Sequence, residues 1–501
     1  MHVLDWAVVA AYLLVMIAIG TWSHRRVSTS SEFFTTGGRL PWWLAGISHH
    51  MSGYSAVIFV AFAGVAYDQG IVSYVMFLFP LAVGTGIGAF LFAPKWNRLR
   101  TRYNIASPLE YLAQRFNVTT QQLMAWSGSL LKVFDVAAKW SAIAALLHGF
   151  VGISTHWGIL VTAVVTLVYC TAGGLWADAL TEFGQFLIQG AAAIAMIAAT
   201  GAALSAQGLD FTTFWSHLPP GHTSPTSSKY PTYFLLVYLL VKTLEYNGGM
   251  WNLAQRYIAT PNARQARRTA LLSSALFLLW PLVLMLPMFA GPLLVHVTDP
   301  EQVYPRMALE FLPPGLLGLV VVGVFSHTMA MAASDATAVS AVLTRDVLPR
   351  ITRRPTDGDP ARSLRAARIL TVTFVALSVL IALNAEALGG VLSLIVTWVG
   401  ALIGPLSIPM LLGMLRPLRY VGPTAAITSW AGGLIAYGLT KYAWDLSTAA
   451  TVVSPVLVSL VLFLAIGALR RDAPPAAEEI TTALSQDAPT RDETVGTGQT
   501  H

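Results

Sequence analysis

A small set of ionisable side chains lies inside the apolar stretches of this sequence. These residues are His49, His50, Lys132, Asp135, Lys139, Glu182, Lys242, Glu245, His327 and Asp335. Placing one such group at membrane depth costs about 2.5 to 3.5 kcal/mol even on a lenient insertion scale, so each marks a candidate functional site. Carboxylates and imidazoles in such places bind cations or relay protons, whereas a buried ammonium group needs an anionic partner.

The spacing of the lysines and acids indicates pairs on single helices. Lys132, Asp135 and Lys139 are three and four positions apart, and Lys242 precedes Glu245 by three. Residues at these spacings share one helix face, where opposite charges can neutralise each other. Internal salt bridges and a binding site are therefore both open interpretations of these residues.

The segment from 326 to 335 offers oxygen ligands along two neighbouring helix faces. His327 and Asp335 share one face, and Ser326 and Ser334 lie on the adjacent one. Hydroxyls, carboxylates and backbone carbonyls are the hard ligands that small cations prefer. This ladder is a candidate cation site.

These groups need elements that can bury them, and the composition indicates membrane helices. Of 501 residues, 55% are hydrophobic and 11% are charged, whereas soluble domains carry about 25% charged residues. Apolar stretches of the length that a membrane helix requires, about 20 residues, predict an all-α polytopic membrane protein with about 13 transmembrane helices. The stretches are 4–22, 42–68, 72–94, 120–148, 154–174, 179–205, 231–251, 269–294, 314–343, 367–385, 389–414, 421–443 and 452–469.

Basic residues gather in alternate loops. The loop after the seventh stretch, for example, holds Arg256, Arg264, Arg267 and Arg268. The positive-inside rule then places the N-terminus outside and the C-terminus in the cytoplasm, in a plasma (inner) membrane. The net charge of +6 reflects this topology and does not indicate nucleic-acid binding. Residues 472–501 show no apolar period and are predicted to be a disordered cytoplasmic tail.

The sequence carries no signature of catalysis. It contains no HExxH, no GxSxG and no GxxxxGK[ST] motif, so we predict that the protein is not an enzyme and has no cofactor other than a coupling ion. A membrane sensor built on a transporter fold is an alternative, but it would need a signalling domain longer than the tail.

Five segments in register resemble the sodium:solute symporter family, relatives of the sodium/glucose, sodium/proline and sodium/sialic acid cotransporters. They are "WWLAGISHHMSGYSAVIFVAFAG" at 42–64, "GGLWADALTEFGQ" at 173–185, "QRYIATPNARQARRTAL" at 255–271, "FSHTMAMAASDATAVSAVLTRDV" at 325–347 and "GALIGPLSIPMLLGML" at 400–415. The resemblance implies cation-coupled symport of a small polar solute by alternating access, in a monomer or homodimer embedded in the lipid bilayer.

The resemblance also implies a LeuT-type core of two inverted five-helix repeats. These map to 42–205 and 231–414, with an extra helix at 4–22 and C-terminal helices at 421–469 completing a transporter domain over 1–471. In this family the first core helix is unwound near its middle, here at about Ser48 to Gly53, where serine and glycine weaken a helix. By position, the carbonyls of Ser48 and Met51 would bind sodium, and the substrate would meet Ser52, Gly53, Tyr54 and Ser55.

The other half of the family's sodium site departs from the pattern. The two positions where the family has hydroxyl side chains fall on Ala330 and Met331. The position three residues earlier, where the family supplies a carbonyl or hydroxyl, falls on His327. Glu182 stands where the family places an acid that helps to bind a cation, and Ser334 stands where some members place a hydroxyl for a second sodium. We therefore predict a shifted site in which the residues that hold sodium are Ser48, Met51, Ser334, Asp335 and Glu182.

Two other interpretations of the histidines and acids remain open. Protons could replace sodium, with His50, His327, Glu182 or Asp335 titrating. The histidines could instead be structural, donating to carbonyls freed by the helix break. A metal site of three histidines is a further hypothesis that sequence spacing does not test.

The substrate site is predicted from buried polar and aromatic residues. Lys132 and Lys139 could bind a carboxylate, unless Asp135 between them is already their partner. Stacking and hydrogen bonds to a small solute could come from Tyr54, Trp140, Tyr246, Asn247 and Trp251. We expect a carboxylate-bearing metabolite, with a sugar or polyol as the alternative.

Overall fold

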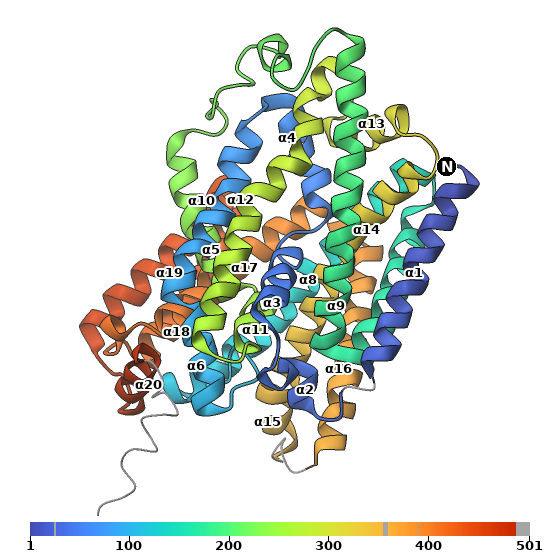
Figure 1. The fold of residues 1–501 in the computed structure, drawn as a ribbon. Helices are drawn as coiled ribbons and strands as arrows, with labels where there is room; N and C mark the ends of the chain where they lie inside the picture. The colour runs from blue at the N-terminus through green and yellow to red at the C-terminus, as the bar shows by residue number, and fades with distance from the viewer. Residues whose placement is uncertain (25–26, 354–358, 389, 487–501) are drawn as a thin grey trace, which may run out of the picture.

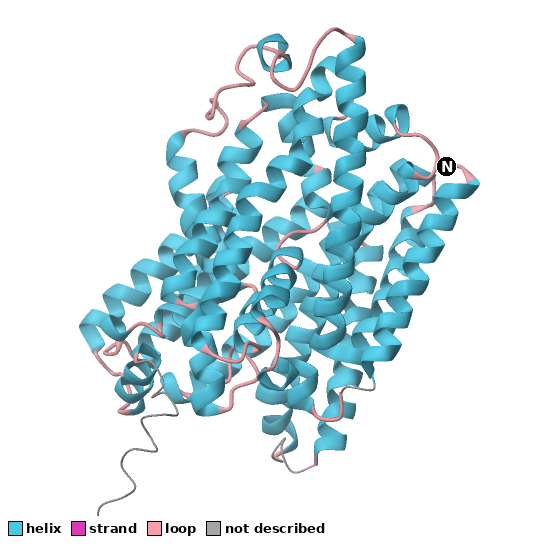
Figure 2. Cartoon of the chain, viewed as in Figure 1, coloured by secondary structure: helices cyan, strands magenta, loops and turns pink. Residues whose placement is uncertain are grey.

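The chain is described here from a computed structural model, over residues 1–24, 27–353, 359–388 and 390–486. Every regular element in these ranges is helical (Figure 2), which confirms the all-α prediction. Within them, 8 helices are long and apolar enough to cross a membrane, or up to 10 if each of two bent pairs is one span. The count of thirteen remains a prediction, since α10 (Thr232–Leu244) and α18 (Pro423–Gly438) are short on their own.

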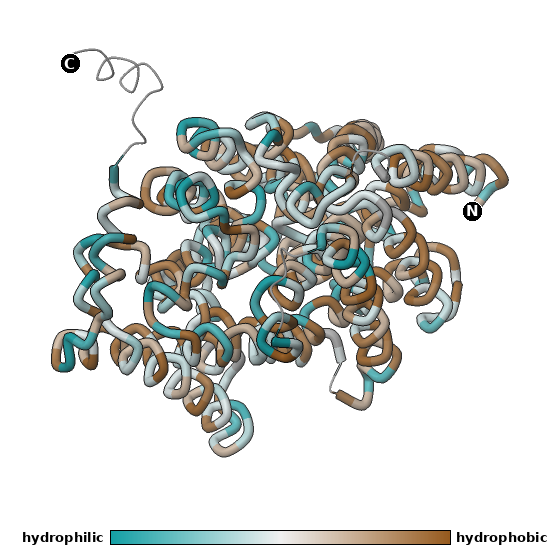
Figure 3. The backbone as a smooth tube through the Cα atoms, turned by 90° about the horizontal axis from the view of Figure 1, so that it is seen from below, coloured by the Kyte–Doolittle hydropathy of each residue, from teal (hydrophilic) through white to brown (hydrophobic). Residues whose placement is uncertain are grey.

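The outer surface is apolar, as contact with lipid requires. Leu14, Ile194 and Leu236, on three different helices, are each at least 66% exposed. Most of α1 (Val3–His24) consists of hydrophobic residues, which are coloured brown in Figure 3. This helix packs on the edge of the bundle against α9 (Thr155–Ala206) and α14 (Leu316–Val342) (Figure 1). Its assignment as an extra N-terminal helix stays a prediction. The described chain begins and ends at opposite ends of the molecule, whereas its orientation in the membrane stays a prediction.

The first predicted core helix is broken. α3 (Trp42–Met51) ends before Ser52, and η2 (Ala56–Phe59) and α4 (Ala61–Gln69) continue at an angle of 51°. The break is confirmed, but it begins at Ser52, at the end of the range expected. Gly53 is required there because a Cβ would lie 2.3 Å from Cζ of Phe277.

A second break interrupts the seventh predicted span. α10 leads into a π-helical turn, η5 (Glu245–Gly249), and α11 (Trp251–Ile258) starts afterwards. Gly248 adopts a φ of 152° at this point. The sequence placed Arg256 in a cytoplasmic loop, and this was wrong: α11 carries it into the interior, where its exposed fraction is 0%. Each expected repeat thus starts with a broken helix, although the inverted repeat itself remains a prediction.

The remaining helices surround these two broken ones. α8 (Val118–Val151) packs against α14, α16 (Pro360–Leu383) and α17 (Gly390–Leu412). α5 (Phe79–Leu91) and α12 (Ala263–Leu294) pack together, and α19 (Thr448–Arg470) lies beside α17 and α18 (Figure 1). α9 merges two predicted spans across a kink at Gly174, whose φ is 53°.

The predicted disordered tail is corrected over part of its length. Residues Ala476–Ser485 form α20, which buries Ile480 and Leu484 and packs on α6 (Ala93–Tyr103) and α7 (Leu112–Arg115). Nη1 of Arg98 donates to the Leu484 carbonyl at 2.6 Å. Cations at the last carbonyls of a helix stabilise it. The sequence of the tail alone does not reveal this contact with Arg98. Residues 487–501 lie outside the described residues.

Candidate functional site

A buried cluster of Arg256 and oxygen atoms lies beside the two helix breaks. Nη2 of Arg256 lies 3.1 and 3.2 Å from the two carboxylate oxygens of Glu182 and 2.6 Å from Oγ of Ser334. The same nitrogen donates to Oγ of Ser52 at 3.1 Å, and Nε donates to Oγ of Ser48 at 2.9 Å. All five side chains have an exposed fraction of 0%.

This cluster brings together three of the residues predicted to bind a cation. The hydroxyls of Ser48, Ser52 and Ser334 all donate to Glu182, the last at 2.8 Å. The positive charge among these oxygens is the guanidinium of Arg256, which carries five donors and cannot be deprotonated. In the described conformation it neutralises Glu182 and hydrogen-bonds to the hydroxyls of Ser48, Ser52 and Ser334. Only the Ser334 hydroxyl was predicted to bind sodium, since Ser48 was expected to bind it through its carbonyl. Sequence reasoning missed Arg256 because a broken helix carries it inward from an apparent loop.

A second buried cluster joins α8 to α14. Nζ of Lys132 lies 2.7 Å from Asp135 and 2.8 Å from Asp335, and Nζ of Lys139 lies 2.8 Å from Asp135. Lys139 also forms an ion pair with Asp335. The two ammonium groups lie 5.0 and 6.0 Å from the ring centroid of Trp398 on α17. We call the two lysines and two aspartates the charged quartet; its formal charge is zero.

In the described conformation the quartet separates two residues of the predicted sodium site, which itself stays a prediction. Ser334 and Asp335 were expected to bind one ion, but Ser334 contacts Glu182 on α9 whereas Asp335 contacts the two lysines of α8. Consecutive residues of an α-helix project about 100° apart, since a turn takes 3.6 residues, so the two side chains serve different clusters. Lys132 and Asp135 are paired, as the interpretation of internal salt bridges predicted.

The quartet lies close to both helix breaks. The two breaks contact each other, because the Tyr246 hydroxyl in the second break donates to the Gly53 carbonyl in the first. One turn before Lys132, a Cβ at Gly128 would lie 2.5 Å from the Trp251 ring at the start of α11. The two clusters therefore lie around the same central region.

Three other predicted substrate residues, Tyr54, Ser55 and Asn247, make internal hydrogen bonds. The Tyr54 hydroxyl hydrogen-bonds with Nε2 of His50 at 2.9 Å, and Oγ of Ser55 accepts from the Val57 amide at 3.5 Å. Nδ2 of Asn247 donates to the carbonyls of Gly84 and Thr243, each at 2.8 Å. Asn247 thus holds α10 against α5.

Several buried polar atoms near the breaks have no hydrogen-bond partner among the residues that the structure describes. They are Nε1 of Trp251, Oδ1 of Asn252, both side-chain polar atoms of Gln255, Oγ of Ser129 and Nε1 of Trp398. Leaving such an atom unsatisfied costs about 1 to 3 kcal/mol, so a group of them marks a place for a polar ligand or water. Trp251 was predicted to contact the substrate, as was Asn247 in the second break, whose Oδ1 also has no partner among the described residues.

The three histidines have different surroundings. Both ring nitrogens of His49 are hydrogen-bonded, to Ser273 at 2.7 Å and to Tyr257 at 2.8 Å, as a structural histidine requires. The His327 ring stacks on Tyr54, with 4.6 Å between centroids, and lies beside the Met51 backbone, whose carbonyl was expected to face sodium.

The hypothesis of a three-histidine metal site is not supported. His327 contacts Gln189, and within the described ranges no three His, Cys, Asp or Glu side chains are grouped so that they could hold a metal ion.

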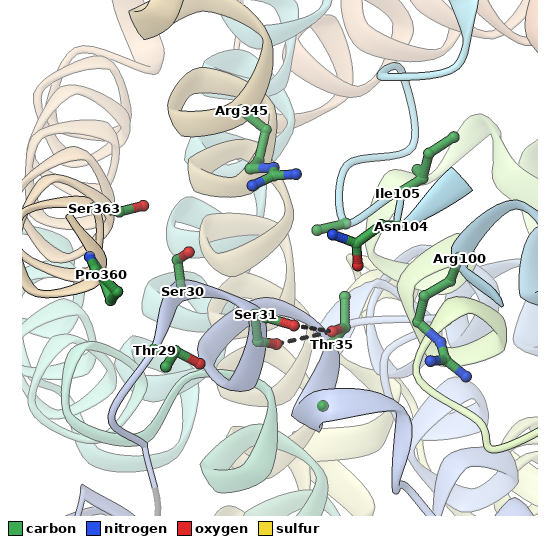
Figure 4. A pocket seen from close by; sticks show the side chains of 12 residues that line it. Thr29, Ser30, Ser31, Thr35, Arg100, Asn104, Ile105, Arg345, Pro360 and Ser363 are labelled. Carbon is green, nitrogen blue, oxygen red and sulfur yellow. Dashed lines mark hydrogen bonds between the residues drawn. The ribbon is translucent and has the colours of Figure 1, made fainter. Parts of the chain in front are cut away.

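A polar cavity of about 320 Å³ lies apart from these clusters, at the end of the molecule that carries α2 (Ser30–Thr35) and α6 (Figure 4). Arg345, which pairs with Glu110 at 2.9 Å, points toward it. None of the predicted site residues lines it. The lining residues are Thr29, Ser30, Ser31, Thr35, Gly37, Arg100, Asn104, Ile105, Ala106, Arg345, Pro360 and Ser363.

Comparisons with known proteins agree with this architecture. A model of the sodium:solute symporter family matches residues 33–418. The sodium/sialic acid symporter SiaT of Proteus mirabilis is 22% identical over 392 residues, covering 74% of this chain and 75% of that protein. The human sodium/iodide cotransporter is 26% identical over 465 residues, covering 87% and 70%.

A solved structure supports the fold independently. It shows the substrate-bound outward-open state of a sodium-coupled sialic acid symporter, with a TM-score of 0.77, 20% identity, and coverage of 94% of this chain and 99% of that one. Because the family match spans more than half of the sequence, the chain belongs to the sodium:solute symporter family, a family of membrane transporters and not of enzymes.

Proposed function

We propose that this sodium-coupled symporter carries a small solute with a carboxylate group across the plasma membrane by alternating access. The observation that supports the solute class is the pair of buried ammonium groups, Lys132 and Lys139. Lys132 lies one helix turn from Gly128, which packs on Trp251 at the second break. A buried ammonium group needs an anionic partner. A carboxylate entering the central region would find two ammonium groups, together with Nε1 of Trp398, a donor that has no partner among the described residues.

Relatives point to the same class and to its alternative. Two of them are named sodium/sialic acid symporters, and sialic acid carries a carboxylate. Others are named sodium/myo-inositol and sodium/glucose cotransporters, which fits the sugar or polyol alternative. The lysine pair favours the carboxylate, because a carboxylate can replace one of the two aspartates that hold the ammonium groups, whereas a neutral polyol cannot take over an ion pair.

Sodium binding would use the oxygens around Arg256. Ser48, Ser334, Glu182 and the Met51 carbonyl form the proposed site, with Arg256 withdrawing as the ion enters. Half-helix ends at broken helices are where transporters of this kind bind ions and solutes, and the bundle that contains them rocks to expose the site to each side in turn.

Proton coupling is the alternative for the ion. Nδ1 of His50 has no hydrogen-bond partner among the described residues, and a neutral imidazole nitrogen of this kind can accept a proton. His50→Gln would then abolish uptake driven by a pH gradient, while leaving a sodium-driven transporter unaffected.

The test is thermal unfolding of the detergent-purified protein with acetate, lactate, sialic acid and the neutral lactamide, in sodium or choline buffers of equal ionic strength. A ligand that binds only the folded protein raises its stability by RT ln(1 + [L]/Kd). We expect stabilisation by a carboxylate, dependent on sodium, and none by lactamide.

Variants make the test specific. Lys132→Gln should remove the effect, whereas Lys242→Gln is the matched control, since Lys242 is a buried lysine paired with Glu245 at 2.6 Å on its own helix segment. Stabilisation by glucose or myo-inositol alone would reject the carboxylate class. Stabilisation that depends on pH and not on sodium would support the proton alternative.

A further inference from the structure

The charged quartet is more than a pair of helix salt bridges. Asp135 lies between Lys132 and Lys139 on one helix and already contacts both. Asp335 adds a second carboxylate from α14, 196 residues away from Lys139 in sequence. Buried ion pairs contribute little net stability compared with apolar packing, so stability alone does not account for four buried charges across two helices.

The formal charge of the quartet limits what can bind to it. Two lysines and two aspartates sum to zero, and the exposed fraction of each is 5% or less. A carboxylate added to this cluster would leave one uncompensated negative charge in a medium of low dielectric constant, which is strongly unfavourable. An anionic solute can therefore enter only if a cation enters with it.

The two aspartates differ in how firmly they are held. Asp135 is three and four positions from the lysines on the same helix, so it stays beside them whatever α14 does. The hydrogen bonds of Asp335 described in the structure are those to Lys132 and Lys139. Asp335 is thus the carboxylate that a solute can displace.

We propose that Asp335 occupies the position of the solute's carboxylate when no solute is bound. The arriving carboxylate takes over the two ammonium groups, and the released Asp335 carboxylate binds a sodium ion at a place distinct from the oxygens around Arg256. One anion and one sodium ion then enter together, which makes the charge balance of the quartet the origin of coupling. This inference rests on the proposed carboxylate class of the solute.

The experiment measures the apparent Kd of acetate, lactate and sialic acid for the full-length protein by thermal shift and calorimetry, in sodium and in choline. In the wild type we expect sodium to tighten binding of a carboxylate by about 5- to 150-fold, the usual range for coupling between two ligands. In Asp335→Asn the quartet has one surplus positive charge, so the carboxylate should bind without sodium, at least as tightly as it binds to the wild type with sodium.

Two further variants serve as a conservative control and as a substitute in case Asp335→Asn does not fold. Asp335→Glu keeps the carboxylate and should keep the sodium dependence. If Asp335→Asn does not fold, Lys139→Gln/Asp335→Asn removes one charge of each sign, so the cluster is again neutral but lacks the carboxylate proposed to bind sodium; it should bind a carboxylate in neither sodium nor choline, and binding that still depends on sodium would overturn the inference.

The outcomes separate this inference from the proposed function. Wild-type binding of a carboxylate with sodium, and an unchanged sodium dependence in Asp335→Asn, would overturn the inference and leave the carboxylate class standing. If none of the three acids binds the wild type under either condition, the carboxylate class fails and the inference fails with it.

Discussion

Removing the guanidinium from the Arg256 cluster should destabilise the protein more than almost any other single change. Arg256 donates hydrogen bonds to four side chains and to the Asn252 carbonyl. In Arg256→Leu the carboxylate of Glu182, with an exposed fraction of 0%, loses its counter-charge. Breaking a buried ion pair from one side costs about 3 to 5 kcal/mol.

The double variant distinguishes loss of the pair from loss of packing. Glu182→Leu alone leaves the guanidinium unpaired, so we expect a loss of about 3 to 5 kcal/mol there as well. In Arg256→Leu/Glu182→Leu neither charge remains, and at least about 2 kcal/mol of the summed loss should be recovered, within the range measured for residues in contact. Denaturant unfolding in detergent, followed by tryptophan fluorescence, gives all four free energies of the cycle.

Sodium provides a second readout of the same cluster. In Arg256→Leu the Glu182 carboxylate keeps its negative charge and the hydroxyls of Ser48, Ser52 and Ser334 stay beside it, but the cation is lost. Sodium should replace it and stabilise this variant by about 2.7 kcal/mol at a concentration of 100 times Kd, with a smaller effect on the wild type.

A surface ion pair provides the control for this double-mutant cycle. Arg306 and Glu310 are 58% and 40% exposed, so Arg306→Leu should cost no more than about 1 kcal/mol. The interpretation of Arg256 as a buried counter-charge would be refuted if the losses of its two single variants simply add in the double variant and sodium stabilises Arg256→Leu no more than choline.

Three further predictions concern packing. Leu484→Ala should release α20, exposing the segment after Arg471 to limited proteolysis while the bundle stays intact, because Leu484 is buried against α6 and α7; unchanged protection would contradict this. Gly53→Ala should reduce folded yield in size-exclusion chromatography through its clash with Phe277, and Phe277→Leu should restore it; a normal yield for Gly53→Ala alone would show that the ring moves aside. His49→Phe should lower unfolding stability by about 1 to 3 kcal/mol by leaving Ser273 and Tyr257 unpaired, with no change in the ion dependence of uptake; altered ion dependence would give His49 a role in coupling.

Much of the site follows from local chemistry in the sequence. The apolar stretches predict the helices because their length must match the bilayer. Ser52 and Gly53 favour the helix break that the family resemblance implies in such a stretch, and the spacing of Lys132, Asp135 and Lys139 predicts their pairing on one helix face. Each of these features depends on residues within a few positions of one another, which is why a single sequence reveals them.

Contacts between distant helices were decided only by the tertiary structure. The break after Gly248 turns Arg256 from an apparent loop residue into the counter-charge of Glu182. Helix packing separates Ser334 from Asp335 and brings Asp335 to two lysines on α8. Composition and periodicity show that these charges are buried, but which charges neutralise one another depends on the rotation and packing of whole helices, and that is determined by the side chains of the entire core.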